Sequence, residues 1–336
     1  MTTMQDVARH AGVSPMTVSN VINEHPHVRE STRQRVLASI AELGYHVNTA
    51  ARTLRQGRTG VVCLAVPEID RPYFGHLASL LIDRAAARGF ELVVEQTEAS
   101  RDRELDAIAR SRLRNYDGLI LSAVQLHDDD AMLLRGDYPT VILGERAFSE
   151  PLDHVVMANE DGARLAAAHL IDQGCTRVAM LGGYHSGVGA VDVSTLRTRG
   201  FEEGLRGRGI DPAAAVIRSS DFSFEGARAA TTALLAEIPE LDGLFCATDV
   251  IAIGAIRALA DAGRRVPHDV KVVGFDDVPL AAYVTPSLTS VAPDHAAMAD
   301  AAISLLIDRI EGSRPSGDFR TVTGPVRLIE RESSAT

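Results

Sequence analysis

The sequence predicts a small all-α head followed by an α/β body of two doubly wound parallel-sheet subdomains. Three observations support this prediction. Three short amphipathic helical segments fill residues 1–46, and a tight turn separates the first two. From Val61 onward, short apolar runs alternate with amphipathic helical stretches, which is typical of parallel sheets covered on both faces. About eight candidate strands in the body indicate two such units rather than one.

The head begins with two helices that carry clear boundary signals. Thr3 and Asp6 have the spacing of a capping box, and Gly12 can end the first helix. Ser14 can cap a second helix with Pro15 at its first position. A third helix is expected from about residue 30 to the stop signal at residue 44, with four buried side chains: Val36, Leu37, Ile40 and Leu43.

The second helix presents two different faces. Val18, Val21 and Ile22 recur at helical spacing and mark its buried face. The opposite face carries small or amide side chains, including Pro15, Met16, Thr17 and Asn20. Because this face is polar but uncharged, it suits the major groove of DNA better than a solvated surface, and the pair of helices predicts a DNA-binding helix-turn-helix. A three-helix bundle without a partner is the alternative.

The charge distribution agrees with a nucleic-acid partner for the head alone. Residues 1–58 hold seven arginines and four acidic residues, a net charge of +3, whereas the whole chain carries −11. Residues 47–59 form an arginine-rich connection in which residues 50–56 can make a short hinge helix. Two turns of helix are unstable alone in water, so we expect this segment to order only against a partner.

The composition and the missing motifs exclude several classes of protein. No apolar run reaches the roughly 18 residues of a membrane span, and the first residues lack the basic and apolar regions of a signal peptide, so we expect neither feature. Cys63, Cys175 and Cys246 are far apart in apolar contexts, which predicts buried free thiols in a reducing cytoplasm. The chain has no dinucleotide-binding glycine motif, no P-loop and no nucleophile elbow. We therefore expect neither an enzyme nor a bound metal or cofactor.

Polar and aromatic residues follow the predicted strands, at the edge where ligands bind in open parallel sheets. Carboxylates and amides there suit ligand hydroxyls, and ring faces suit a sugar or base plane. The candidates are Asp70, Tyr73, Phe74, Glu145, Arg146, Asn159, Asp221, Phe222, Asp249, Asp276 and Asp277. By position alone, Asp249 could equally cap the helix that follows it.

The chain resembles the LacI/GalR family of bacterial transcription regulators. The opening "DVARHAGVSPMTVSNVIN" matches the family closely, "AELGYHVNTAARTLRQG" is similar to its hinge, and "ATDVIAIGAIRAL" and "VKVVGFDDVPLAAYVTPSLTSV" extend the resemblance through the body. The resemblance implies a periplasmic-binding-protein-like body with a cleft between its subdomains. It also implies a hinge at 47–59 and a ligand-binding and dimerisation domain at 60–336. Its N-subdomain would span about 60–158 and 290–320, and its C-subdomain about 159–289 and 321–336.

The resemblance also implies roles for individual residues. Pro15, Met16 and Asn20 would face base edges, Leu54 would act as a minor-groove wedge, and Arg55 would contact a neighbouring phosphate or base. The implied ligand contacts are Tyr73, Phe74, Arg197, Phe222, Asp249 and Asp276. The chain departs from the family pattern at Val47, Ala158 and Ala292, where proline, aspartate and glutamine are frequent.

The expected function is a cytoplasmic repressor of a carbohydrate operon. It would bind a near-palindromic operator as a homodimer and leave it when a small sugar binds. A purine- or nucleoside-responsive regulator is the alternative within the family. A sugar-binding transport protein is the alternative from another class, although it would need export and has no use for the head.

Overall fold

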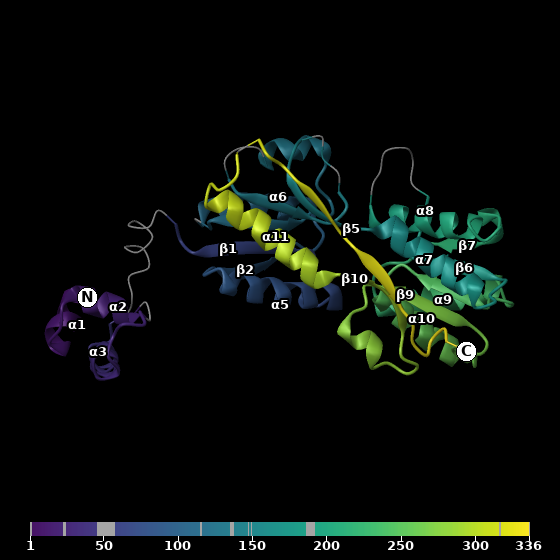
Figure 1. Ribbon diagram of the computed structural model, residues 1–336. Helices are drawn as coiled ribbons and strands as arrows, with labels where there is room; N and C mark the ends of the chain where they lie inside the picture. The colour runs from purple at the N-terminus through teal and green to yellow at the C-terminus, as the bar shows by residue number, and fades with distance from the viewer. Residues whose placement is uncertain are drawn as a thin grey trace. The chain divides into compact units, whose positions relative to one another are not determined.

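The computed structural model describes residues 2–22, 25–45, 58–114, 116–134, 138–146, 148, 150–185, 192–315 and 317–335 (Figure 1). The chain divides into two compact units, residues 1–59 and residues 60–336. The expected hinge helix, with Leu54 and Arg55, lies outside the described residues. In the described part of the chain, no helix has the length and apolarity needed to span a membrane.

Unit 1 is a three-helix head whose first two helices follow the predicted boundary signals. Its helices are α1 (Met4–Ala11), α2 (Pro15–Ile22) and α3 (Glu30–Glu42). Thr3 and Asp6 form the capping box, since the Asp6 amide donates to Thr3 Oγ1 at 3.3 Å and the Thr3 amide to Asp6 Oδ2 at 3.0 Å. Gly12 ends α1 with φ of 63°, a left-handed conformation that glycine adopts without strain. The Thr17 amide donates to Ser14 Oγ at 3.1 Å and so caps α2.

The core of the head differs from the prediction at one position. Val36 is fully buried, but Leu37 is 50% exposed, so its predicted burial is wrong. Tyr45, just beyond α3, packs into the core instead, together with Val18 and Val21 of α2. Leu37 follows Val36 directly, and one helical step of about 100° carries it past the edge of the buried face.

Unit 2 contains two six-stranded sheets. The first has the order β11-β5-β4-β3-β1-β2. All its neighbours pair in parallel. Helices α5 (Pro72–Ala87) and α11 (His295–Ile310) pack on one face, and α6 (Arg101–Leu113) packs on the other. The strands are β1 (Val61–Val66), β2 (Glu91–Gln96), β3 (Gly118–Ser122), β4 (Thr140–Leu143), β5 (Asp153–Met157) and β11 (Thr321–Gly324).

The second sheet repeats this order as β12-β10-β9-β8-β6-β7, and only the β10–β12 pair is antiparallel among its pairs. Its strands are β6 (Val178–Leu181), β7 (Val216–Arg218), β8 (Gly243–Cys246), β9 (Lys271–Phe275), β10 (Thr289–Pro293) and β12 (Val326–Ile329). Its helices are α7 (Asn159–Asp172), α8 (Val193–Arg206), α9 (Phe224–Glu237) and α10 (Asp249–Asp261). Short 3₁₀ segments lie at Asp128–Leu134, Pro212–Ala214 and Pro279–Ala282.

Three single-residue crossovers join the sheets, and two of them donate a hydrogen bond to the segment of the third. Ala158 links β5 to α7, Asp294 links β10 to α11, and Pro325 links β11 to β12. The Ala158 amide donates to the Gly324 carbonyl at 3.3 Å, and the Asp294 amide donates to the Pro325 carbonyl at 3.0 Å. Figure 1 shows the C-terminal strands passing from the first sheet to the second.

The sheets place two subdomain boundaries differently from the sequence-based ones. Residues 289–293 pair in the second sheet and residues 321–324 in the first, so the chain crosses at 294 and 325 rather than at about 290 and 321. Strand membership depends on hydrogen bonds to distant segments, which local sequence does not encode. The three cysteines are buried and free, as predicted.

Candidate functional site

Arg197, on α8, is the centre of a buried polar cluster at the junction of the subdomains. Its side chain is 2% exposed. Nε donates to Asn159 Oδ1 at 2.7 Å, Nη1 donates to the Ala247 carbonyl, and Nη2 donates to Asp276 Oδ1 at 3.4 Å. Asn159, Ala247 and Asp276 follow β5, β8 and β9, so the cluster lies at the carboxyl ends of these strands, where open parallel sheets bind ligands.

Burial dominates the electrostatics of this ion pair. It raises the pKa of Asp276 to about 6, and the neighbouring Arg197 charge opposes that rise. Burial lowers the pKa of Arg197, while Asp276 and Glu145 oppose the decrease. Both pKa shifts indicate that burying these two charges away from water costs free energy. A ligand that offers hydroxyl groups to this pair would replace part of the lost hydration.

The N-subdomain contributes Tyr73 and Glu145 to the same cluster. Burial raises the pKa of the Tyr73 phenol, and the nearby carboxylates of Asp276 and Glu145 raise it further. Glu145, after β4, accepts from the Met157 amide at 2.9 Å, and burial raises the pKa of its carboxyl group. Phe74 meets the Tyr73 ring edge-on with centroids 4.9 Å apart. The two subdomains thus bring carboxylates, an arginine, an amide and aromatic rings together.

Asp249 lies under the loop that carries Asp276 and is fully buried. Its Oδ2 accepts from the Val278 amide at 2.8 Å, and its Oδ1 accepts from Ser290 Oγ at 2.5 Å. Thr248, rather than Asp249, caps α10 through its side chain. Because both carboxylate oxygens of Asp249 have partners in the protein, its geometry fits a role in holding the loop.

That loop has an unusual backbone. Asp276 has φ of 107° and Asp277 has φ of 46°, values that side-chain-bearing residues rarely adopt. The Asp276 amide donates to the Val291 carbonyl at 2.9 Å, and the Asp277 amide donates to Ser290 Oγ at 3.0 Å. Together with Asp249, these bonds hold a strained turn that presents the Asp276 carboxylate to Arg197.

Phe222 lies apart from the Arg197 hydrogen bonds but still connects the subdomains. The guanidinium carbon of Arg71, which precedes α5, is 5.7 Å from the centroid of the Phe222 ring. Arg71 also pairs with Glu68. Phe222 is partly buried, and a ligand that stacked on the ring face beneath Arg71 would compete with this cation.

Sequence reasoning missed His295, the first residue of α11. Its ring centroid is 5.6 Å from that of Tyr73 and 5.2 Å from that of His76. Its Nε2 is buried without a hydrogen-bond partner in the part of the chain that the structure describes. Burial is the main cause that lowers its pKa to about 4, so the ring is neutral at pH 7. A lone histidine after an N-cap aspartate gives no sequence signal for this burial.

Four of the predicted DNA-contacting residues lie on α2. Met16 is 69% exposed and Pro15 is exposed, whereas Thr17 and Asn20 are partly buried. Thr17 Oγ1 lies 2.9 Å from Ser14 Oγ. Val18 and Val21 point into the core of the head, as predicted. The surface of α2 therefore presents two apolar side chains, Pro15 and Met16, beside the partly buried polar side chains of Thr17 and Asn20.

Comparison with known proteins agrees with this architecture. The family model "Bacterial regulatory proteins, lacI family" matches residues 3–48, and "Periplasmic binding protein-like domain" matches residues 167–334. The ribose operon repressor of Halalkalibacterium halodurans is 34% identical over 334 residues, which cover 99% of this chain and 97% of that protein.

Two solved structures are similar over nearly the whole chain. The complex of the transcriptional regulator CelR with cellobiose is 30% identical with a TM-score of 0.72, covering 99% of this chain and 100% of that chain. The lac repressor dimer bound to operator and the anti-inducer ONPF is 28% identical with a TM-score of 0.81, covering 100% and 99%. These similarities confirm the fold class expected from the sequence, and the chain belongs to the lacI family of bacterial regulatory proteins.

Proposed function

We propose that this protein is a cytoplasmic transcriptional repressor of a carbohydrate operon, that it binds a near-palindromic operator as a homodimer, and that a small sugar releases it. The observation that carries the proposal is the pairing of a separate helix-turn-helix unit with a body in which Tyr73 and Glu145 of one subdomain lie near the buried Arg197–Asp276 pair of the other. The operator and dimer of the lac repressor and the cellobiose complex of CelR agree with it.

The head would read DNA through α2. In this proposal Asn20 pairs with an adenine edge, Met16 contacts a thymine methyl group, and Pro15 and Thr17 pack along the groove. Leu54 would wedge into the minor groove and Arg55 would contact the backbone beside it. A dimer would then place its two heads on half-sites about one helical turn apart.

Selection from a random duplex pool with the full-length protein tests DNA binding. The expected result is an enriched near-palindrome whose binding constant falls steeply with salt concentration. Asn20→Ala should cost about 1–3 kcal/mol and relax the preference at one position of each half-site. If no duplex is enriched at low salt, the repressor proposal fails, and a sugar-binding transport protein becomes the better hypothesis.

The effector would bind among the strand ends around Arg197. Asp276, Glu145 and Asn159 would take hydroxyl groups, and Tyr73, Phe74 and Phe222 would cover ring faces. Asp249 would act through the Asp276 loop. Binding there would change the hinge between the subdomains, and a coupling of about 1–3 kcal/mol would change operator affinity five- to 150-fold.

A thermal-shift panel of sugars, polyols, sugar phosphates, nucleosides and purines tests the effector class. We expect selective stabilisation by a neutral sugar, lost in Asp276→Asn and accompanied by release of the selected duplex. Stabilisation by purines or nucleosides alone would instead make Phe222 and Tyr73 the stacking residues for a base. The absence of catalytic motifs favours a binding role over an enzymatic one.

A further inference from the structure

Every connection between the subdomains leaves the N-subdomain through one of three elements. β5 ends at the crossover residue Ala158, α11 begins after Asp294, and β11 ends before Pro325. A change in the relative orientation of the subdomains must therefore move the crossover ends of these three elements.

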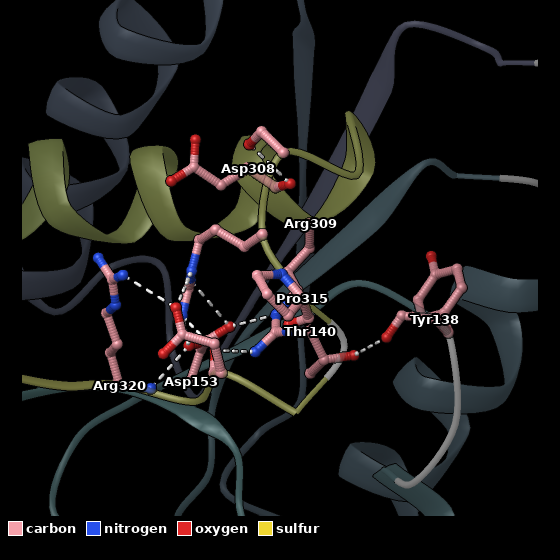
Figure 2. Close-up of polar contacts among 10 residues, drawn as sticks. Tyr138, Thr140, Asp153, Asp308, Arg309, Pro315 and Arg320 are labelled. Atoms are coloured by element: carbon pink, nitrogen blue, oxygen red, sulfur yellow. Dashed lines mark hydrogen bonds and ion pairs between the residues drawn. The ribbon is translucent and has the colours of Figure 1, made fainter.

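The far ends of the same three elements meet at one carboxylate. Asp153 is the first residue of β5 and is 1% exposed. Arg309, in the last turn of α11, donates from Nε to Asp153 Oδ2 at 2.7 Å, and the Arg320 amide, just before β11, donates to Asp153 Oδ1 at 3.0 Å. Figure 2 shows the Arg309 side chain and the backbone of Arg320 beside the Asp153 carboxylate.

The segment between α11 and β11 closes around this carboxylate. Arg314, whose side chain is 6% exposed, donates from Nη2 to Asp153 Oδ1 at 3.1 Å and also contacts Asp318. Arg309 Nη1 donates to the Pro315 carbonyl at 2.9 Å. Because three cationic or amide donors share one buried acceptor, a displacement of one element changes the contacts of the others.

Asp153 also lies at the edge of the sheet where the chain enters the body. The strands of this sheet are parallel, so the start of β5 and the start of β1 share one edge. Gly60, which follows the head and its connection, donates its amide to Asp117 Oδ2 at 2.7 Å at this edge. The crossovers lie at the opposite edge, beside Arg197.

We propose that Asp153 is a positioning residue that couples the three crossovers to the sheet edge where Gly60 and Val61 lead the chain into the body. The inference rests on the proposed function, because coupling has meaning only if the head binds DNA. A purely structural Asp153 would stabilise the N-subdomain without transmitting anything. The two roles differ in whether DNA binding by the head changes the stability of the crossover hydrogen bonds.

Hydrogen exchange of the full-length protein, with and without the selected duplex, separates these roles. The Ala158 and Asp294 amides report on the crossovers, since each donates to a neighbouring crossover segment. In the unmodified protein we expect the duplex to change their exchange rates at least about fivefold. In Asp153→Asn the change should fall below about twofold while the duplex remains bound.

Two further variants make the result decisive. Arg314→Gln removes one partner but leaves Arg309 on Asp153, so it should fold and give an intermediate change. Glu104→Gln is the matched control, since Glu104 is fully buried in the same subdomain and accepts only from the loop amides of Val124, Gln125 and Leu126 among its hydrogen-bond donors in the described chain. It should lower the melting temperature yet keep the full change.

The outcomes distinguish the inference from the proposed function. An undiminished exchange response in Asp153→Asn would show that Asp153 has a structural role only. A loss of response in Glu104→Gln as large as in Asp153→Asn would have the same meaning. Failure to select any duplex would overturn the proposed function itself, and the coupling with it.

Discussion

The guanidinium carbon of Arg197 lies 3.5 Å from the centroid of the Phe275 ring, so the flat face of the cation rests on an aromatic face. Its edges donate at the same time to Asn159, Ala247 and Asp276. A planar cation that stacks on a ring and donates in its own plane uses the properties that distinguish arginine from lysine. The site therefore specifies arginine by shape as well as by charge.

Arg197→Lys should consequently be destabilising despite the retained charge. A lysine has one compact ammonium group, which cannot reach all three acceptors while covering Phe275. We expect a loss of about 2–4 kcal/mol in the free energy of unfolding, measured by urea denaturation. The matched control is Arg208→Lys, because Arg208 pairs with Asp172 at the surface through Nε and Nη2. That variant should lose less than about 1 kcal/mol, and equal losses would contradict the prediction.

The positive φ of Asp276 allows its carboxylate and its backbone to be tested separately. Asp276→Gly and Asp276→Ala both remove the carboxylate, but only glycine relieves the strain at φ of 107°. The glycine variant should be the more stable of the two by about 1 kcal/mol in thermal unfolding. Both should lose effector binding equally. If alanine proved as stable as glycine, the turn would not be strained in solution.

Local signals made the head predictable. The Thr3 capping box, Gly12 and Ser14 act within one helical turn, so the sequence pattern alone places α1 and α2. The starts of the central body strands were also predictable from local sequence. Strands that helices cover on both faces are almost wholly buried, and such strands appear in the sequence as short apolar runs. Leu37 was mispredicted because burial at the margin of a helix face depends on what packs beside it.

The parts of the site that were not predicted depend on non-local contacts. β10 and β11 carry small polar residues, and their sheets are decided by distant partners such as Val273 and Val155. Asp249 accepts a hydrogen bond from Ser290, which lies 41 residues away, so no local sequence pattern reveals this contact. His295 is buried only because α5 brings Tyr73 and His76 against it.

Asp249 offers a test of how the Asp276 loop is held. Asp249→Asn keeps an oxygen for the Val278 amide and an amide for Ser290, so it should fold and keep effector binding. Asp249→Ala leaves the buried backbone amide of Val278 without its acceptor, so it should lower the free energy of unfolding by about 1–3 kcal/mol. Burial raises the pKa of Asp249 well above its usual value, so the folded state holds its proton more tightly than the unfolded state.

The raised pKa of Asp249 determines how the stability of these variants depends on pH. The contribution of Asp249 to stability decreases as pH rises above about 4, the ordinary aspartate range. The unfolding free energy of Asp249→Asn relative to the original protein should therefore increase with pH, measured by urea titrations from pH 4 upward. A constant difference would mean that the carboxyl group titrates normally despite its burial.

His295 predicts a pH dependence of the opposite sign. Burial and the charge of His76 lower its pKa to about 4, against the opposing effects of Asp277 and Asp294. His295 is therefore protonated below about pH 6.5 in the unfolded chain but only below about pH 4 in the folded chain. The free energy of unfolding therefore decreases as the pH falls through this range. His295→Leu, which is close in volume, should remove that part of the loss, about 3 kcal/mol between pH 7 and pH 4 in urea denaturation. The same substitution at the exposed His268 controls for the loss of an imidazole. Parallel pH profiles for His295→Leu and the original protein would show that His295 is hydrated in solution.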